Sequence, residues 1–380
     1  MLHSKQRYLF IDLLRFLAVV FMVQGHTFDA LLDFELRSNL LFFVHDFFHG
    51  FIAPMFLFAS GVAFGISTMK KWEEHTAPTR HVARRYGKFI GLIVIGYALH
   101  LPFFSLTKIV REATSAEIAT WLQVDALHCI AVTMLLLQSA VFILKDEKKF
   151  IRWTIVSAAI IIFLSPIIWS LDLVNSLPLW LASYLNAGNN SWFPLFPWSA
   201  YILCGVIFAS IFLNAKEHYH AVQLMQNTVS VGIVMLIVSI IVINLPTHMY
   251  PLHDVWKVNP LIIAARLGFV LLVTSAVFFA EHSFKITSKI PQIIGRESLF
   301  IYVLHLIILY GSVMNKGLQH LILPTLSVME ALAAFIIIFF GIASFTFGWY
   351  RMKKQFPRIA MAARIMVAMT FIILFLIRPY

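Results

Sequence analysis

The chain has 380 residues, of which 60% are hydrophobic and only 12% are charged. Soluble domains carry roughly twice that share of charged residues, so this composition excludes a water-soluble globular protein. The formal net charge of +11 comes from basic residues placed between apolar runs, and no nucleic-acid partner is expected. Cys129 and Cys204 lie inside apolar runs, which predicts packing residues and neither disulfides nor a metal site. The composition therefore predicts an integral membrane protein.

Long apolar runs follow one another along the chain, each close to the roughly 20 residues that a helix needs to cross a bilayer. The runs are continuously apolar, whereas the strands of a membrane barrel alternate, so helices are expected. The predicted fold is all-α: a polytopic membrane helix bundle of about eleven transmembrane helices, forming a single domain over residues 1–380. The predicted spans cover residues 8–31, 47–68, 87–106, 122–144, 151–171, 194–213, 227–245, 260–280, 293–313, 328–349 and 360–378.

The distribution of Lys and Arg predicts the orientation of these spans. Twenty of these residues, beginning with Lys5 and Arg7, fall on the side of the N-terminus, and six fall on the opposite side. Cytoplasmic loops carry the excess of Lys and Arg, so we expect a cytoplasmic N-terminus and an extracytoplasmic C-terminus. The expected location is the cell (inner) membrane.

The first span contains three ionisable residues, Asp12, Arg15 and His26, that share one face of a helix. Ionisable groups inside a membrane are expensive and are candidates for function. Asp12 and Arg15 are one turn apart, so an ion pair that holds helices together explains them equally well.

The second span begins with His45, Asp46 and His49, and the two histidines are four residues apart on one face. The first two spans form a hairpin, so these groups and His26 can converge at the outer boundary of the membrane. A histidine oriented by a carboxylate is a general base near neutral pH. The alternative is a chance group of interfacial histidines. No fourth ligand accompanies them, and no metal is expected.

Two later spans carry further polar residues. Asp125 and His128 are three residues apart at the start of one span. Ser298, Tyr302 and His305 form a stripe along another, where a lone histidine is more often a packing residue. His128, Tyr302 and His305 are candidate donors to an oxyanion.

A basic cluster of Arg84, Arg85 and Lys88 lies where the third span enters the membrane. It is either ordinary cytoplasmic charge or a clamp for the phosphates of a cofactor. The Pro-rich segment 193–198 interrupts the sixth span at its outer end, where it either shapes an entrance or starts the helix.

Several of these segments together resemble the heparan-α-glucosaminide N-acetyltransferase-like membrane proteins. Residues 10–26, with Asp12, Arg15 and His26, resemble the opening helix of that family, and residues 49–61 resemble its second helix. Residues 122–130, 193–198 and 295–305 resemble its later motifs. Their order and spacing carry the resemblance.

The resemblance implies acetyl transfer across a membrane. In the lysosomal member, cytosolic acetyl-CoA donates its acetyl group to a terminal glucosamine on the far side, and a histidine in the first non-cytoplasmic region is the key catalytic residue. That region holds His45 and His49 here, with His26 nearby. The first span follows only a few residues, so the expected acceptor is an envelope glycan or a lipid-linked sugar, and heparan sulfate is not expected.

We therefore predict a membrane acyltransferase that uses acetyl-CoA as co-substrate and acetylates an amine or hydroxyl of a sugar or glycan. The sequence is also compatible with a homodimer. The alternatives are a proton-coupled secondary transporter of a small polar solute, using Asp12, Arg15, Asp125 and His305, and a non-catalytic scaffold. The candidate catalytic residues are His49, His45, His26, Asp46, Asp125 and His128. The candidate donor-binding residues are Asp12, Arg15, Arg84, Arg85, Lys88, Ser298, Tyr302 and His305.

Overall fold

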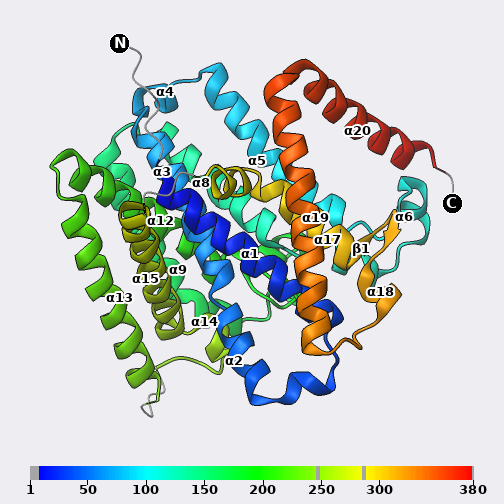
Figure 1. Cartoon of the computed structure of the whole chain (residues 1–380), viewed down its shortest axis with the longest axis horizontal. Helices are drawn as coiled ribbons and strands as arrows, with labels where there is room; N and C mark the ends of the chain where they lie inside the picture. The colour runs from blue at the N-terminus through cyan, green and yellow to red at the C-terminus, as the bar shows by residue number, and fades with distance from the viewer. Residues whose placement is uncertain (1–7, 245–248, 285–287, 379–380) are drawn as a thin grey trace. The chain divides into compact units, whose positions relative to one another are not determined.

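The computed structural model describes residues 8–244, 249–284 and 288–378, and this part of the chain is built almost entirely of helices (Figure 1). Its one sheet is a short antiparallel hairpin of β1 (Gly311–Ser312) and β2 (Asn315–Lys316), with Gly311 opposite Lys316. The predicted all-α fold is confirmed. Lys5 and Arg7, used above to predict the orientation, lie outside the described residues.

The helices follow in chain order. They are α1 (Leu9–Leu31), η1 (Glu35–Ser38), α2 (Leu40–His49), α3 (Ile52–Met69), α4 (Trp72–Thr76), α5 (Arg80–Leu99), α6 (Leu106–Glu112), α7 (Ser115–Trp121), α8 (Ala126–Leu144), α9 (Glu147–Ser170), α10 (Leu173–Ser176), α11 (Leu179–Leu185), α12 (Leu195–Glu217), α13 (Ala221–Ile243), α14 (Val255–Val258), α15 (Pro260–Phe284), α16 (Ile290–Arg296), α17 (Ser298–Leu309), α18 (Leu318–Ile322), α19 (Val328–Gln355) and α20 (Pro357–Ile377).

Nine spans in the described part of the chain are long and apolar enough to cross a membrane. A tenth is reached if α16 and α17, which meet at a bend of 73°, count as one broken span. The chain is therefore a multi-pass membrane protein. We expected about eleven spans. Residues 87–106 are the predicted span that is missing from these candidates. The helix there, α5, starts seven residues earlier, and its first nine residues include four charged side chains, Arg80, Arg84, Arg85 and Lys88.

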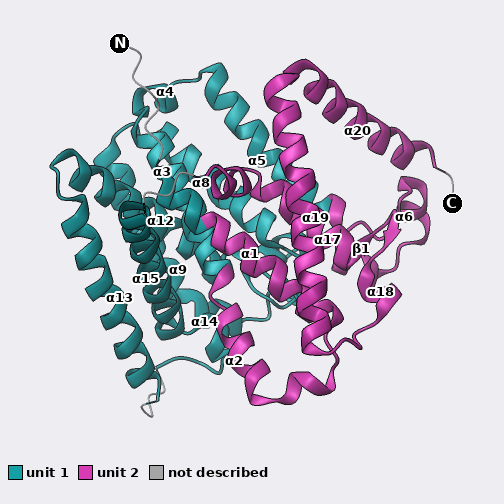
Figure 2. Ribbon diagram, in the orientation of Figure 1, with its two compact units in different colours: residues 1–14, 53–97, 122–286 teal, residues 15–52, 98–121, 287–380 magenta. Residues whose placement is uncertain are grey.

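The described chain divides into two compact units (Figure 2). Unit 1 comprises residues 1–14, 53–97 and 122–286, and unit 2 comprises residues 15–52, 98–121 and 287–380. Helix α1 contributes its first residues to unit 1 and the rest to unit 2. The single domain predicted from the sequence stays a prediction.

Unit 1 packs its helices through glycines that allow the backbones to approach closely. A β-carbon added at Gly61 of α3 would lie 2.0 Å from the carbonyl oxygen of Ile202 in α12, and one at Gly205 would lie 2.2 Å from the carbonyl oxygen of Phe58. Helices α13 and α15 lie side by side (Figure 1) and cross with similar closeness at Gly232 and Gly268. Small residues at helix crossings are the usual means by which membrane helices associate.

The Pro-rich segment 193–198 starts α12 in unit 1. Pro194 precedes the helix, Phe196 has non-helical backbone angles, and the indole N–H of Trp169 donates to the carbonyl oxygen of Phe196 at 2.7 Å. This bond satisfies a carbonyl that the interrupted first turn leaves available. Of the two interpretations drawn from the sequence, the helix start describes the local geometry.

Unit 2 packs α17 against α19. The ring of Phe300 stacks on Phe345 and Trp349, with centroids 5.6 Å and 5.9 Å away. Lys353 donates a hydrogen bond to the carboxylate of Glu297, which lies at the bend between α16 and α17. These contacts hold α17 in place and thereby position the polar stripe that it carries.

Candidate active site

Four histidines from three helices of unit 2 gather in one cluster, which we call the histidine cluster: His26 on α1, His45 and His49 on α2, and His305 on α17. The ring centroid of His26 lies 5.2 Å from that of His305 and 6.0 Å from that of His49. His45 and His49 stack at 6.0 Å. The convergence of His26, His45 and His49 expected from the hairpin is present, and His305 joins them.

The innermost member of the cluster is His305, whose side chain is fully buried. Its Nδ1 lies 3.0 Å from the carbonyl oxygen of Ile301, an acceptor only, so Nδ1 carries the proton. The lone pair is then on Nε2, which is buried and has no hydrogen-bond partner among the described residues. His305 is therefore a neutral imidazole with an acceptor atom beside His26.

His26 is held by a tyrosine that follows α17. Nδ1 of His26 lies 3.0 Å from the hydroxyl of Tyr310, and the two rings are 5.7 Å apart. A phenol is protonated at neutral pH, so this group is a donor that sits next to the cluster.

His45 and His49 are positioned by α1. The side-chain amide nitrogen of Gln24 lies 2.9 Å from Nε2 of His45, and the ring of Phe28 stacks on that imidazole at 5.2 Å. Gly25 leaves room for His49, because a β-carbon added at Gly25 would lie 1.7 Å from Nε2 of His49. This Nε2 is buried and has no hydrogen-bond partner in the described part of the chain.

Asp46 was predicted to orient one of these imidazoles. It is exposed on α2, and it makes no side-chain hydrogen bond to His45 or His49 within the described residues. Its charge faces both histidines from the same helix. Asp46 thus acts on them at longer range than a hydrogen-bonded carboxylate.

Asp125 and His128 form a close pair in unit 1. Nδ1 of His128 lies 2.7 Å from Oδ1 of Asp125, and the same carboxylate accepts the backbone N–H of His128 at 3.0 Å. The backbone N–H of Asp125 lies in turn 3.3 Å from Nδ1 of His128, which completes a capping box at the start of α8, and His128 is fully buried against the ring of Tyr97 at 4.2 Å. Starting a helix therefore accounts for this pair.

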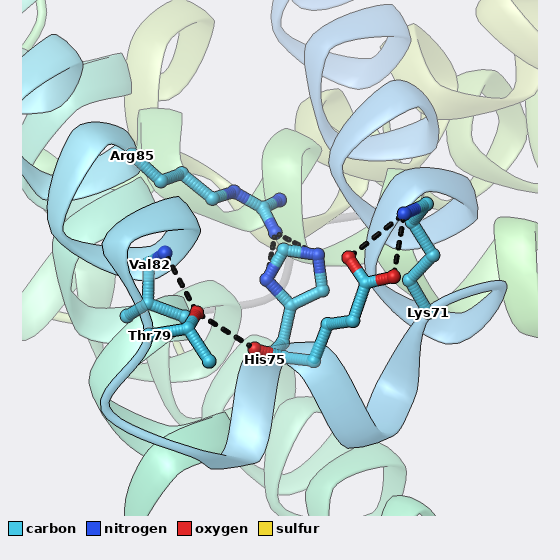
Figure 3. A network of polar contacts seen from close by, with 6 residues as sticks. Lys71, His75, Thr79, Val82 and Arg85 are labelled. Atoms are coloured by element: carbon cyan, nitrogen blue, oxygen red, sulfur yellow. Dashed lines mark hydrogen bonds and ion pairs between the residues drawn. The ribbon is translucent and has the colours of Figure 1, made fainter.

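The predicted basic cluster divides into two kinds of side chain. Arg84 and Lys88 are exposed and lie four residues apart on α5, in line with the exposed Arg80 one turn earlier. Arg85 turns into unit 1, where its Nη1 lies 3.0 Å from Nδ1 of His75 (Figure 3). Its Nη2 donates to Ser67 Oγ at 3.2 Å.

The turn between α4 and α5 encloses this arginine. Lys71 donates to the carboxylate of Glu74 at 2.6 Å, and the hydroxyl of Thr79 accepts the backbone N–H of Val82 at 3.2 Å (Figure 3). The carbonyl oxygen of His75 accepts from the amide of Gln138 at 3.2 Å. The bonds to His75 and Ser67 give Arg85 a structural role. We call the three exposed residues that remain, Arg80, Arg84 and Lys88, the exposed basic stripe.

The remaining predicted residues are distributed over both units. Asp12 is buried on the unit 1 part of α1, and Arg15 is half-buried on the unit 2 part. Ser298 and Tyr302 are buried on α17, and the ring of Tyr302 lies 5.6 Å from His305. Within residues 8–244, 249–284 and 288–378, no group of three His, Cys, Asp or Glu side chains has an arrangement that could hold a metal ion.

Three residues that position the histidine cluster escaped the sequence interpretation: Gln24, Gly25 and Tyr310. Gln24 and Gly25 directly precede His26, and a polar residue beside a glycine within an apolar span is the signal that could have found them. Tyr310 stands at the end of a span, where a tyrosine normally serves as an interfacial anchor.

The fold and the cluster together define the class. The described chain combines nine or ten apolar spans with a group of four imidazoles and a tyrosine hydroxyl in unit 2, the kind of groups that general acid–base catalysis uses. The family model described as heparan-alpha-glucosaminide N-acetyltransferase, catalytic, matches residues 7–239, more than half of the chain. The chain belongs to this family of membrane acetyltransferases.

The match includes His26, His45 and His49 and ends before α17, which carries His305. Comparison with curated proteins and with solved structures found no match.

Proposed function

We propose that this protein transfers an acetyl group from cytoplasmic acetyl-CoA to an amine or hydroxyl of a sugar or glycan on the extracytoplasmic side of the cell membrane, with His49 as the general base. The observation that carries the proposal is the histidine cluster of unit 2, and three of its members, His26, His45 and His49, fall within the residues that the family model matches. Its four imidazoles come from three helices, α1, α2 and α17.

His49 is preferred as the base because its Nε2 is buried and has no hydrogen-bond partner among the described residues. In His45 the corresponding nitrogen already contacts Gln24. A base must lie within hydrogen-bond reach of the proton that it removes, and an unengaged imidazole nitrogen in the first non-cytoplasmic region meets this need.

In the proposed reaction, Nε2 of His49 takes the proton of the acceptor amine or hydroxyl while that atom attacks the thioester carbon. The new C–N or C–O bond forms, the C–S bond breaks, and the proton passes from His49 to the departing CoA sulfur. The hydroxyl of Tyr310 donates a hydrogen bond to the oxyanion between these steps, and it accepts one from the Nδ1–H of His26, which lies 3.0 Å away. The ring of His305 packs beside that of His26, with centroids 5.2 Å apart.

The donor end of the proposal rests on the exposed basic stripe. Three cationic side chains, Arg80, Arg84 and Lys88, follow one face of α5 at successive turns, and cationic groups at that spacing suit the phosphates of CoA. Arg85 has no part in this, because it is bound to His75.

The first test measures thermal stability of the purified full-length protein with acetyl-CoA, with ATP as an anionic control. A ligand at 100 times its Kd stabilises the native state by about 2.7 kcal/mol, so acetyl-CoA should raise the Tm and ATP should not. The double variant R84Q/K88Q should need more acetyl-CoA for the same shift, whereas Lys354→Gln, an exposed lysine on α19, should behave as the parent does.

The second test measures transfer of labelled acetyl to a panel of sugar acceptors. His49→Ala should lower kcat by about 10²–10⁴-fold, and the exposed His218→Ala should leave it unchanged. Full transfer by both His49→Ala and His45→Ala would remove the assigned base. Substrate-driven proton flux in proteoliposomes, without release of CoA, would establish the transporter in its place.

A further inference from the structure

A cavity of about 790 Å³ lies in unit 2, bounded by the chain that follows α5, by α7 and by the β1–β2 hairpin with the ends of α17 and α18. Its volume falls within the range of about 300–1,000 Å³ that small-molecule sites occupy. None of the residues selected from the sequence as catalytic or donor-binding lines this cavity. The roles proposed above for the predicted residues therefore leave this cavity without a function.

The cavity reaches the histidine cluster through Tyr310. This residue is one of the lining residues, and its hydroxyl lies 3.0 Å from Nδ1 of His26. Leu306, one turn before Tyr310 on α17, lines the same wall. A molecule held in the cavity would thus contact Tyr310, which hydrogen-bonds to His26 of the cluster and is the proposed donor to the oxyanion.

The charge of the lining indicates the chemistry of that molecule. Lys316, His100 and His320 contribute basic groups, and no carboxylate belongs to the lining. Lys316 is exposed on β2 and makes no ion pair with a carboxylate in the described part of the chain. An unneutralised ammonium inside a concave surface attracts an anionic group.

The other polar lining groups suit a sugar. Thr120, Ser312 and Asn315 contribute hydroxyl and amide groups, which recognise hydroxyl-rich ligands through hydrogen bonds. The nearby carboxylate of Glu117 lines a smaller adjoining cavity of about 310 Å³ and accepts hydrogen bonds from the backbone and the hydroxyl of Thr114, both at 2.8 Å.

We infer that this cavity is the acceptor site and that it selects a sugar bearing an anionic group, a phosphate or a carboxylate, which Lys316 contacts while the acetylated atom faces Tyr310. This inference rests on the proposed function and adds the substrate class and a specificity-determining residue. The anionic sugar can be soluble or attached through its phosphate to a lipid.

The test measures binding to the purified full-length protein without acetyl-CoA, using glucosamine, glucosamine 6-phosphate and inorganic phosphate. Glucosamine 6-phosphate should bind about tenfold more tightly than glucosamine, and Lys316→Gln should abolish this difference without lowering the Tm. Lys316→Arg should retain it, since the charge is kept. The matched control Lys354→Gln removes an exposed lysine of the same unit outside the cavity and should change nothing.

A second arm offers the same sugar joined through phosphate to a polyprenyl chain in nanodiscs. Tighter Lys316-dependent binding of this form assigns the lipid-linked source, and equal binding assigns the soluble one. Equal affinity for glucosamine and glucosamine 6-phosphate, or an anion preference that survives Lys316→Gln, overturns the inference. Sugar binding is measured without acetyl-CoA, so a negative result here is distinct from a negative result for the proposed function. The proposed function would fail if acetyl-CoA did not raise the Tm.

Discussion

Gly25 leaves the space that the imidazole of His49 occupies. The nearest atom to a β-carbon added at this position would be Nε2 of His49, at 1.7 Å, followed by two carbons of the same ring. No rotation of the added methyl group relieves such an overlap, so the imidazole itself would have to move. The glycine thereby sets the position of the proposed base relative to α1.

Gly25→Ala should therefore lower kcat for acetyl transfer by about 10²-fold, because displacement of a reacting group by about 1 Å is worth that much. In the His49→Ala background, the same change should cause no further loss. The matched control is Gly341→Ala on α19, where an added β-carbon has no heavy atom within 4 Å. Full acetyl transfer by Gly25→Ala would show that His49 is not the general base.

Tyr310 supplies a donor that the sequence interpretation did not include. Tyr310→Phe keeps the ring and removes the hydroxyl that lies 3.0 Å from Nδ1 of His26. We expect kcat to fall by about 10²–10³-fold with little change in the Tm, the usual loss when one oxyanion donor is removed.

The control for this change is Tyr184→Phe, which should leave kcat unchanged. The hydroxyl that it removes lies in unit 1, 3.4 Å from the hydroxyl of Tyr97. The measurement is the initial rate at saturating acetyl-CoA. An unchanged kcat in Tyr310→Phe would show that the Tyr310 hydroxyl only contacts His26 and does not stabilise the oxyanion.

At the scale of elements, the turn from α4 to α5 shows how one helix combines surface charge and interior structure. Arg84 and Arg85 are neighbours in the chain, yet Arg84 is exposed and Arg85 is bound to His75 and Ser67. The difference follows from the 100° that separates consecutive residues on a helix. The sequence showed three neighbouring cationic residues, but it could not tell which member faced inward.

His75 should make the stability of this turn depend on pH. Burial, and then the nearby guanidinium of Arg85, lower the pKa of His75 from 6.5 to about 4. Between these values the unfolded chain binds a proton that the folded chain does not, so the free energy of unfolding decreases as the pH falls from about 6.5 to about 4.

The measurement is the Tm of the purified protein across this pH range. The Tm of His75→Gln should decline less steeply than that of the parent protein, because the glutamine does not titrate. His218→Gln, which changes an exposed histidine at the end of α12, serves as the control. Parallel curves for the parent and His75→Gln would show that another group causes the decline.

The same element scale explains the number of spans. Residues 87–106 were predicted as a span because their own composition is apolar, but the helix begins at Arg80 and includes four Lys or Arg in its first nine residues. Helix boundaries depend on caps and packing that hydropathy does not record. The bend of 73° between α16 and α17 is equally invisible to a hydropathy window.

At the scale of the whole molecule, the histidine cluster depends on chain segments that meet only in the folded protein. The hairpin of the first two spans was enough to predict that His26, His45 and His49 converge. His305 and Tyr310 follow His26 by more than 270 residues, and their contacts with it needed the structure. Asp125, one of the predicted catalytic residues, caps α8 beside His128 in unit 1.

By itself, the sequence determined that this is an all-α multi-pass membrane protein with histidines at the start of its second span, because a bilayer imposes span length and apolarity on each segment locally. The resemblance to membrane acetyltransferases was likewise carried by motifs and was confirmed by the family match. Only the tertiary structure decided which polar side chains share a site, which arginine faces inward, and that a cavity lined by Lys316 reaches Tyr310. Those features depend on contacts between distant segments, and no local pattern encodes such contacts.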